Sequence, residues 1–253
     1  MENQTSNQVQ VIRTHTNVAQ KVEIGFQVLS GAFISDNRFV ISTGNILREM
    51  STDWSTATIQ QQKIIQSAEA ILSCTIDGTT GCQYAGLNTG YIHSCSDSLQ
   101  LAPVKNHIIA MASPESMNNL LISIKHSGVL SLDKSTLKIL DTIYTQSEIN
   151  AIDFLPESQQ YVLGDKDGYV ILVSITQEII RKLRVSNHPI RSICKGRTST
   201  EVFVGDNNGN LFSVTDVPQK LEPFNGAIIA LRLSSTNSIE VLCQSGFLYR
   251  KEL

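Results

Sequence analysis

The sequence lacks long apolar segments, an excess of basic residues and an apolar leader. None of its apolar runs approaches the roughly 18 residues that suggest a membrane-spanning helix. The opening stretch, MENQTSNQVQ, is polar where a signal peptide would be apolar. The 20 Lys and Arg are outnumbered by 23 Asp and Glu, whereas a nucleic-acid-binding domain usually carries a clear basic excess. We therefore predict an intracellular protein, of the cytoplasm or nucleus, without membrane insertion and with no indicated nucleic-acid partner.

Motifs for catalysis and for metal or cofactor binding are missing as well. The sequence contains neither a GxSxG nucleophile motif nor a GxxxxGK[ST] phosphate loop. Its five cysteines form no CxxC pair, and no His/Cys spacing fits a zinc site; three of them fall in expected strands with apolar neighbours, which favours buried, reduced thiols. The segment Gly164–Gly168, GDKDG, lacks the distal Glu of a calcium loop and is better explained as a hairpin turn. We expect no enzyme activity, metal or cofactor.

What the sequence has instead is a repeated β-hairpin, seen best at Tyr161–Ser174, YVLGDKDGYVILVS. Two runs of β-branched and aromatic residues flank an Asp-Gly turn, where glycine adopts a positive φ without steric cost. Similar hairpins recur roughly every 40 residues along the chain. Their turn glycines are Gly44, Gly90, Gly128, Gly168, Gly209 and Gly246. The spacing predicts six structural repeats.

A second pattern precedes each hairpin and predicts an inner strand. It begins with a branched residue, and a small residue follows two places later, which suits a strand crowded by its neighbours. The small residues are Ser30, Ser73, Ala110, Ala151, Ser192 and Ala230. Short outer strands such as Thr136–Asp141 follow the hairpins, and we interpret Ser55–Ile71 as an outer strand or an enlarged connection.

Units of three or four short strands predict a ring. A four-stranded blade is apolar on both faces, and radial stacking buries those faces; a period of roughly 40–45 residues is typical of β-propellers. The sequence therefore predicts an all-β propeller with six recognisable blades. The repeats resemble WD40 repeats: Leu132-Asp133 stands at the place of the Trp-Asp dipeptide, and Asn106-His107 and Asn187-His188 stand at the place of Gly-His. No unit combines His, turn Asp and Trp. The resemblance implies a rigid scaffold that presents surfaces to several protein partners.

The two ends of the chain predict how the ring closes. The last unit reaches Leu253 without an outer strand of its own. Near the N-terminus, Asn17–Glu23 (NVAQKVE) resembles the outer segment Asp216–Glu222 (DVPQKLE). We therefore expect Gln20–Ile24 to be the outer strand of the closing blade, because pairing the first and last strands removes two free edges.

One further strand candidate, Val9–Thr14, is left over and has two interpretations. It is either a tail or extra strand on the rim, or part of an incomplete seventh blade that a partner chain completes by β-augmentation. We accordingly divide the chain into residues 1–19, a tail or extra strand, and residues 20–253, a single propeller domain.

Candidate contact residues come from position rather than from a motif. Residues just before each inner strand usually surround one mouth of a propeller, and here they are Glu69, His107, Glu148, His188 and Asn225. The single tryptophan, Trp54, is a candidate exposed anchor for a partner, with core packing between the first two blades as the alternative. The basic cluster Arg181–Arg184 is best explained as a charged strand edge rather than as a contact for an acidic partner or nucleic acid.

These features favour a non-catalytic scaffold subunit of a multi-protein complex. One alternative is a peptide or substrate receptor that binds at a propeller mouth. Another is an open propeller of the nuclear-pore or vesicle-coat type, which a partner blade completes. A propeller hydrolase or lyase would require acids and histidines that converge in the central channel.

Overall fold

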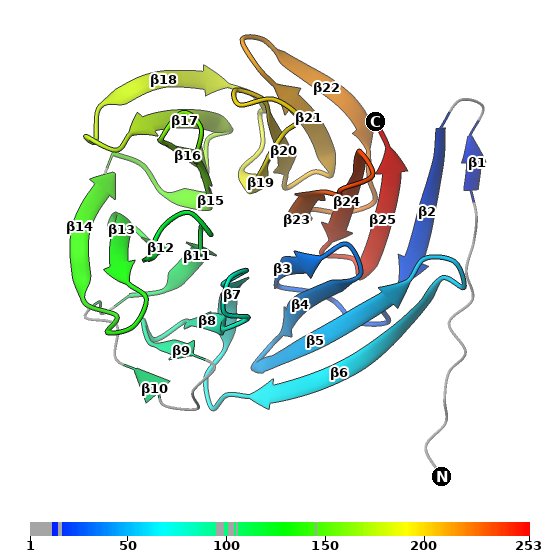
Figure 1. Ribbon diagram of the computed structural model, residues 1–253, viewed down its shortest axis with the longest axis horizontal. Helices are drawn as coiled ribbons and strands as arrows, with labels where there is room; N and C mark the ends of the chain where they lie inside the picture. Colours follow the sequence, from blue (N-terminus) through cyan, green and yellow to red (C-terminus); the bar gives the residue numbers. More distant parts are fainter. Residues whose placement is uncertain (1–11, 15–16, 95–98, 101–103, 105, 145) are drawn as a thin grey trace.

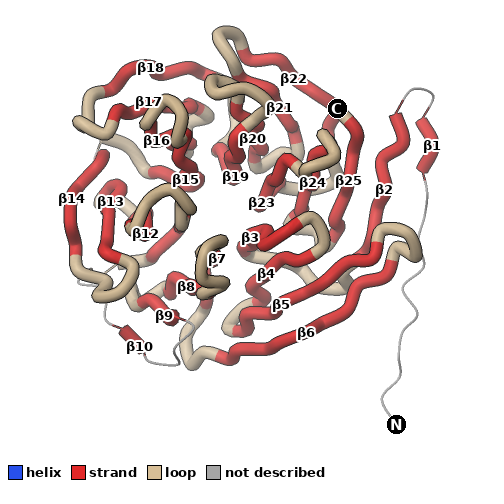
Figure 2. The backbone as a smooth tube through the Cα atoms, in the orientation of Figure 1, coloured by secondary structure: helices blue, strands red, loops and turns tan. Residues whose placement is uncertain are grey.

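The protein folds into a ring of six small antiparallel β-sheets, which we call blades 1 to 6 (Figures 1 and 2). The structure, a computed structural model, describes residues 12–14, 17–94, 99–100, 104, 106–144 and 146–253 of the chain. None of these residues is helical, so this part of the chain offers no helix that could cross a membrane. The predicted all-β propeller with six blades is confirmed.

In each of the first five blades, four consecutive strands run from the central axis to the rim (Figure 1). Blade 1 consists of β3 (Ser30–Ser35), β4 (Arg38–Thr43), β5 (Ile46–Asp53) and β6 (Thr58–Gln66). Blade 2 consists of β7 (Ile71–Ile76), β8 (Gln83–Leu87), β9 (Ile92–Ser94) and β10 (Leu99–Gln100). Blade 3 consists of β11 (Ile108–Ala112), β12 (Asn119–Ile124), β13 (Gly128–Asp133) and β14 (Ile139–Tyr144).

The second half of the chain continues the same pattern. Blade 4 consists of β15 (Ile149–Leu155), β16 (Gln160–Asp165), β17 (Tyr169–Ser174) and β18 (Ile179–Arg184). Blade 5 consists of β19 (Ile190–Lys195), β20 (Val202–Asp206), β21 (Asn210–Val214) and β22 (Pro218–Pro223). Blade 6 draws on both ends of the chain, and its strands are β23 (Ile228–Leu233), β24 (Ser238–Cys243), β25 (Phe247–Glu252), β2 (Asn17–Glu23) and β1 (Ile12–Thr14).

Blade 6 closes the ring in the way that the sequence predicts. Strand β2 pairs antiparallel with β25, from Ala19 opposite Lys251 to Glu23 opposite Phe247, so the expected outer strand of the closing blade is confirmed. Strand β1 pairs with β2 and lies outermost in this blade (Figure 1). Of the segment Val9–Thr14, residues 9–11 lie outside the described residues, and the rest extends blade 6. The described strands therefore form six blades, and none of them begins a seventh.

The six turn glycines have the backbone conformation that the hairpin pattern requires. Their φ angles lie between 69° and 99°, in the left-handed region that other residues rarely adopt. Space imposes a second requirement at Gly209, where a Cβ atom would lie only 2.3 Å from the carbonyl oxygen of Phe224. The turns at Gly90, Gly168 and Gly246 pack against the connection to the next blade in the same way, whereas a Cβ at Gly44 would meet nothing within 4 Å.

Small residues allow neighbouring inner strands to lie close together. The hydroxyl of Ser73 donates a 2.9 Å hydrogen bond to the carbonyl of Ile108, and Ser192 donates one of 2.8 Å to Ile228. Each bond joins one blade to the next. A Cβ atom on Gly205 of β20 would lie 2.5 Å from Cγ2 of Ile228, so the contact leaves no room for a larger residue. The small third position of the inner-strand pattern is thus explained by blade-to-blade packing.

The core lies between the blades, where branched and aromatic side chains from neighbouring sheets interdigitate. Cys74, Cys194 and Cys243 are buried free thiols in strands, as the sequence suggests. Cys82, by contrast, is disulfide-bonded. The sequence did not predict a disulfide bond.

Candidate functional site

The five predicted mouth residues all lie in the connections that precede inner strands. This is the face of the ring that carries the turn glycines. Glu69, His188 and Asn225 are exposed, whereas His107 and Glu148 are half-buried. A carboxylate oxygen of Glu148 lies 2.9 Å from Nδ1 of His126. None of the five lines the central cavity described below, and their proposed role in binding stays a prediction.

Trp54 is buried rather than exposed, so it is not the surface anchor that we considered. Only 8% of its surface is accessible, and its Nε1 donates a 3.3 Å hydrogen bond to the carbonyl of Asp36. Its ring packs with residues of blades 1 and 6, so the alternative placement between blades 1 and 2 is also wrong. The error arises because the partner blade is made from the distant C-terminal segment.

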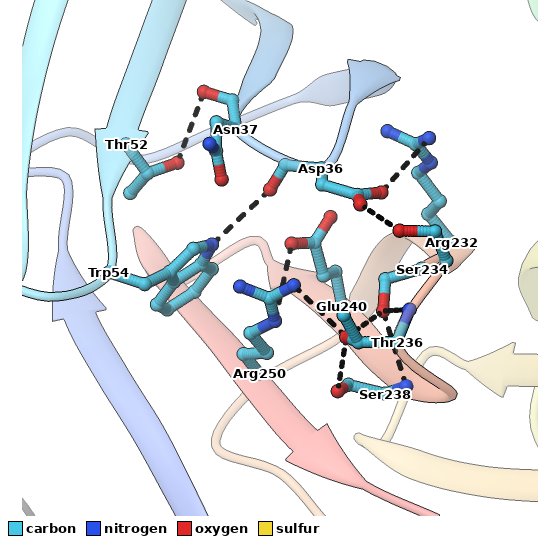
Figure 3. Close-up of polar contacts among 11 residues, drawn as sticks. Asp36, Asn37, Thr52, Trp54, Arg232, Ser234, Thr236, Ser238, Glu240 and Arg250 are labelled. Carbon is cyan, nitrogen blue, oxygen red and sulfur yellow. Dashed lines mark hydrogen bonds and ion pairs between the residues drawn. The ribbon is translucent and has the colours of Figure 1, made fainter.

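Around Trp54 lies a cluster of four charged side chains, which we call the closing seam: Asp36, Arg232, Glu240 and Arg250 (Figure 3). Asp36 comes from the β3–β4 turn of blade 1 and the others from blade 6. One carboxylate oxygen of Asp36 lies 3.1 Å from a guanidinium nitrogen of Arg232, and the other accepts a 2.6 Å hydrogen bond from Ser235. That hydrogen bond is the main reason why the pKa of Asp36 is lowered.

Glu240 is the most deeply buried acid of the closing seam. Its side chain lies 3.9 Å from Nε of Arg250, and among the described residues neither carboxylate oxygen accepts a hydrogen bond. Burial raises its pKa to about 7, since the charged form is poorly solvated there. The closing seam therefore joins the first and last blades through charged groups, of which Glu240 has a pKa near neutral.

The six inner strands surround the axis of the ring (Figure 2). Their residues line a cavity of about 590 Å³. In blades 2 to 6 the inner strand has a β-bulge after its first residue, because the pairing skips the second residue. A bulge re-aims a side chain that regular pairing would direct between sheets. All five skipped residues line the cavity, and they are Leu72, Ile109, Asn150, Arg191 and Ile229.

The two ends of the cavity differ in chemistry. The first residue of each bulged inner strand pairs next to the glycine turn, as Ile190 does with Asp206. The bulge residues therefore lie toward the glycine-turn face. Toward the other face the lining includes Asp153, which accepts hydrogen bonds from the backbone N–H groups of Phe154 and Lys195. Burial raises the pKa of Asp153 to about 6.

Two thiols also line the cavity, but they are poor nucleophiles. Burial raises the pKa of Cys74 to about 12 and also raises that of Cys194. Only a thiolate attacks efficiently, and these groups stay protonated near neutral pH. Within the described part of the chain, no three His, Cys, Asp or Glu side chains gather closely enough to hold a metal ion. The cavity is therefore equipped for binding polar and apolar groups rather than for thiol chemistry.

Asp165 and Asp206, which precede two of the turn glycines, anchor the hairpins of blades 4 and 5. One oxygen of Asp206 accepts 2.8 Å hydrogen bonds from the backbone of Asn208 and Asn210, and the other accepts one of 2.6 Å from Ser186. The hydroxyl oxygen of Ser186 also accepts a hydrogen bond from the backbone N–H of His188. From the sequence, we expected these aspartates only to form turns. Their regular place in GDKDG and GDNNG is the sequence feature that could have indicated their role.

Exposed apolar side chains lie on the outer strands of blades 3 and 4 and in the connections that lead into β18 and β22. They are Ile139, Leu140, Ile175, Ile179, Ile180 and Val217, and we call them the outer apolar surface. Polar contacts hold the blades together beneath it: Gln177 donates to Asp141 of blade 3, and Arg181 lies 2.7 Å from Asp216 of blade 5. The outer strands β14, β18 and β22 follow one another around the rim (Figure 1). The exposed apolar residues therefore occur on the rims of three successive blades.

Comparison with known proteins gives no relative from which a role could be transferred. No protein-family model matches the chain, and no curated protein matches it significantly.

Proposed function

We propose that this protein is a non-catalytic interaction scaffold, a WD40-like propeller subunit of a multi-protein complex. The outer apolar surface carries the proposal, because exposed large apolar side chains recur on the rims of three successive blades, and exposed apolar patches mark interaction sites. Two of its members, Leu140 and Ile180, are 55% and 51% exposed. The hydrogen bonds from Ser147 to Asp165 and from Ser186 to Asp206, next to two turn glycines, support the resemblance to WD40 repeats. An intracellular location, and the division into residues 1–19 and a propeller domain of residues 20–253, belong to the same proposal.

The chemistry of the rim suggests what kind of partner it would bind. Basic residues Lys182 and Arg184 lie on β18 beside the apolar side chains, and both approach the ring of Tyr169. In the sequence alone these charges indicated a protected strand edge. Beside the exposed Ile179 and Ile180 they would instead complement a partner segment with apolar residues flanked by acids. Among the described strands, β18 pairs only with β17, so its other edge can accept such a segment by β-augmentation.

The test compares two surfaces of equal exposure. Tagged full-length protein is purified from the cells that produce it, and the stoichiometry of the bound proteins is measured by mass spectrometry. The double variant Leu140→Asp with Ile180→Asp is expected to lose a stoichiometric partner. The control is Ile64→Asp, because Ile64 is 50% exposed on β6 of blade 1 and lies outside the outer apolar surface. Retention of the partner by the double variant, with both proteins folded, would refute the assignment.

A second candidate function is a peptide receptor at the glycine-turn mouth, which Glu69, His107, Glu148, His188 and Asn225 surround. The axial cavity favours it, because a volume of about 590 Å³ is within the usual range of ligand sites. Many substoichiometric clients in the purification, with one sequence preference on a peptide array, would support this function over the scaffold.

A further inference from the structure

Arg191 is an arginine without a partner. Of the arginines whose side chains the structure describes, the others contact a carboxylate, a hydrogen-bonding group or an aromatic ring: Arg38, Arg48, Arg181, Arg184, Arg197, Arg232 and Arg250. No hydrogen bond, ion pair or ring contact joins the Arg191 guanidinium to any described residue. Five N–H donors are therefore free in a half-buried side chain.

Because of its surroundings, the unpaired charge of Arg191 is unfavourable in free energy. Arg191 occupies the bulge position of β19 and lines the axial cavity, where the equivalent residues of blades 2, 3 and 6 are Leu72, Ile109 and Ile229. Burial lowers the pKa of Arg191, with no contribution from a nearby charge. A cation removed from water needs an anion or hydrogen-bond acceptors to offset the lost hydration.

The carboxylates of the cavity do not supply this anion. The lining contains two acids, Glu115 and Asp153, and neither forms an ion pair with Arg191 within 4.0 Å. Glu115 lies in the loop after β11, and Asp153 already accepts two backbone hydrogen bonds. Both lie toward the face opposite the glycine turns.

Asn150, the bulge residue of neighbouring blade 4, adds a second polar group at the same level of the cavity. Its side-chain amide has no hydrogen-bond partner among the described residues. An arginine fork and an amide donor beside aliphatic side chains match a planar carboxylate on an apolar stem, since guanidinium binds carboxylate through two parallel hydrogen bonds. The other cations of the lining, Lys195 and Arg232, lie toward the opposite face. At this level a single guanidinium balances one negative charge, which favours a monocarboxylate over a dianionic phosphate.

We propose that the axial cavity binds an aliphatic monocarboxylate, which pairs with Arg191 and Asn150 and lies against the aliphatic bulge residues. The group belongs either to a free small molecule or to the C-terminus of a partner peptide. The proposal does not depend on the outer apolar surface, so the two can fail separately.

The test uses two probe pairs and the full-length protein. Octanoate is compared with octanol, and a short N-acetylated peptide ending in leucine is compared as free acid and as amide. Binding is measured by calorimetry and by the arginine Nε–Hε resonance that disappears in Arg191→Leu. We expect one of the acids to bind and to shift this resonance, and its neutral counterpart not to bind. In Arg191→Leu the affinity should fall roughly tenfold or more, because a charge-assisted pair is lost.

Matched variants keep the result interpretable. Arg48→Leu removes an arginine from β5 of blade 1, outside the cavity lining, and should leave binding unchanged. If Arg191→Leu does not fold, Arg191→Gln provides the same comparison with a polar side chain. Binding of octanoate alone would identify a small molecule as the occupant, and binding of the peptide acid alone would identify a C-terminus. Absence of binding by both acids, or equal affinity in the Arg191 variants, would overturn the proposal.

Discussion

Replacing Glu240 by glutamine should change how the stability of the protein depends on pH. The side chain is 1% exposed, faces Arg232, Arg250 and Asp36, and accepts no hydrogen bond from a described residue. Burial raises its pKa to about 7 from an ordinary value of 4.5. The folded protein therefore holds this proton more tightly than the unfolded chain does.

The sign and size of the effect follow from that difference. Below about pH 4.5 the glutamate is protonated in both states, and its full contribution to stability is present. As the pH rises toward 7, the unfolded chain ionises first, so the free energy of unfolding falls. The difference between the two pKa values corresponds to about 3 kcal/mol across this range. Asp153, whose pKa burial raises to about 6, adds a smaller fall of the same sign in wild type and variant alike.

The assay is urea unfolding of wild type and Glu240→Gln at intervals between pH 4.5 and 8. Glutamine cannot ionise, so the stability of the variant relative to wild type should increase by about 3 kcal/mol over this range. Glu178→Gln serves as the control, because Glu178 is exposed in the turn before β18. A difference between Glu240→Gln and wild type that stays constant with pH would refute the reasoning about the closing seam.

Two further predictions concern the frame of the ring. Asp206→Ala should lower the free energy of unfolding by about 3 kcal/mol, because it leaves several buried donors without an acceptor. Chemical unfolding measures this loss, and the control is Asp167→Ala, an exposed position in the equivalent turn of blade 4. Similar losses of stability in both variants would contradict the prediction. Deleting residues 1–23 should expose the edge of β25 and cause association or unfolding, whereas deleting residues 1–16 should leave β2 in place and the ring closed. Light scattering and thermal unfolding measure both, and a stable monomer after the longer deletion would show that β2 is not needed for closure.

The parts of the fold that the sequence predicted depend on neighbouring residues. A turn glycine such as Gly168 lies between its two strands, so residues of one short segment determine the hairpin. Contacts between blades 1 and 6 are different, because the bond between Ser235 and Asp36 joins residues 199 positions apart. No local pattern pairs such residues, which is why Trp54 was assigned to the wrong environment.

The candidate sites were less predictable than the fold for a related reason. The inner-strand pattern indicated the small residue at Ser192 correctly, but it did not reveal that the residue before it is skipped by the pairing. Alternation along a regular strand would place Arg191 between blades, and only the bulge turns it to the axis. The outer apolar surface could not be predicted for the same reason. In the sequence Leu140 and Ile180 look like any other apolar strand residues, and only the arrangement of the blades shows that their strands lie at the rim.

The bulge of the inner strands assigns two roles to different residues of one strand, namely packing against the neighbouring blades and lining the axial cavity. Its flanking residues are constrained by the neighbouring blades, since Ile190 packs against blade 4 and Ser192 donates a hydrogen bond to blade 6. The skipped residue makes neither of these contacts. Substitutions at the skipped position can therefore alter the chemistry of the lumen while the packing of the ring is preserved. A family of such rings could diversify in ligand choice through five positions, one in each of blades 2 to 6, without acquiring a new architecture.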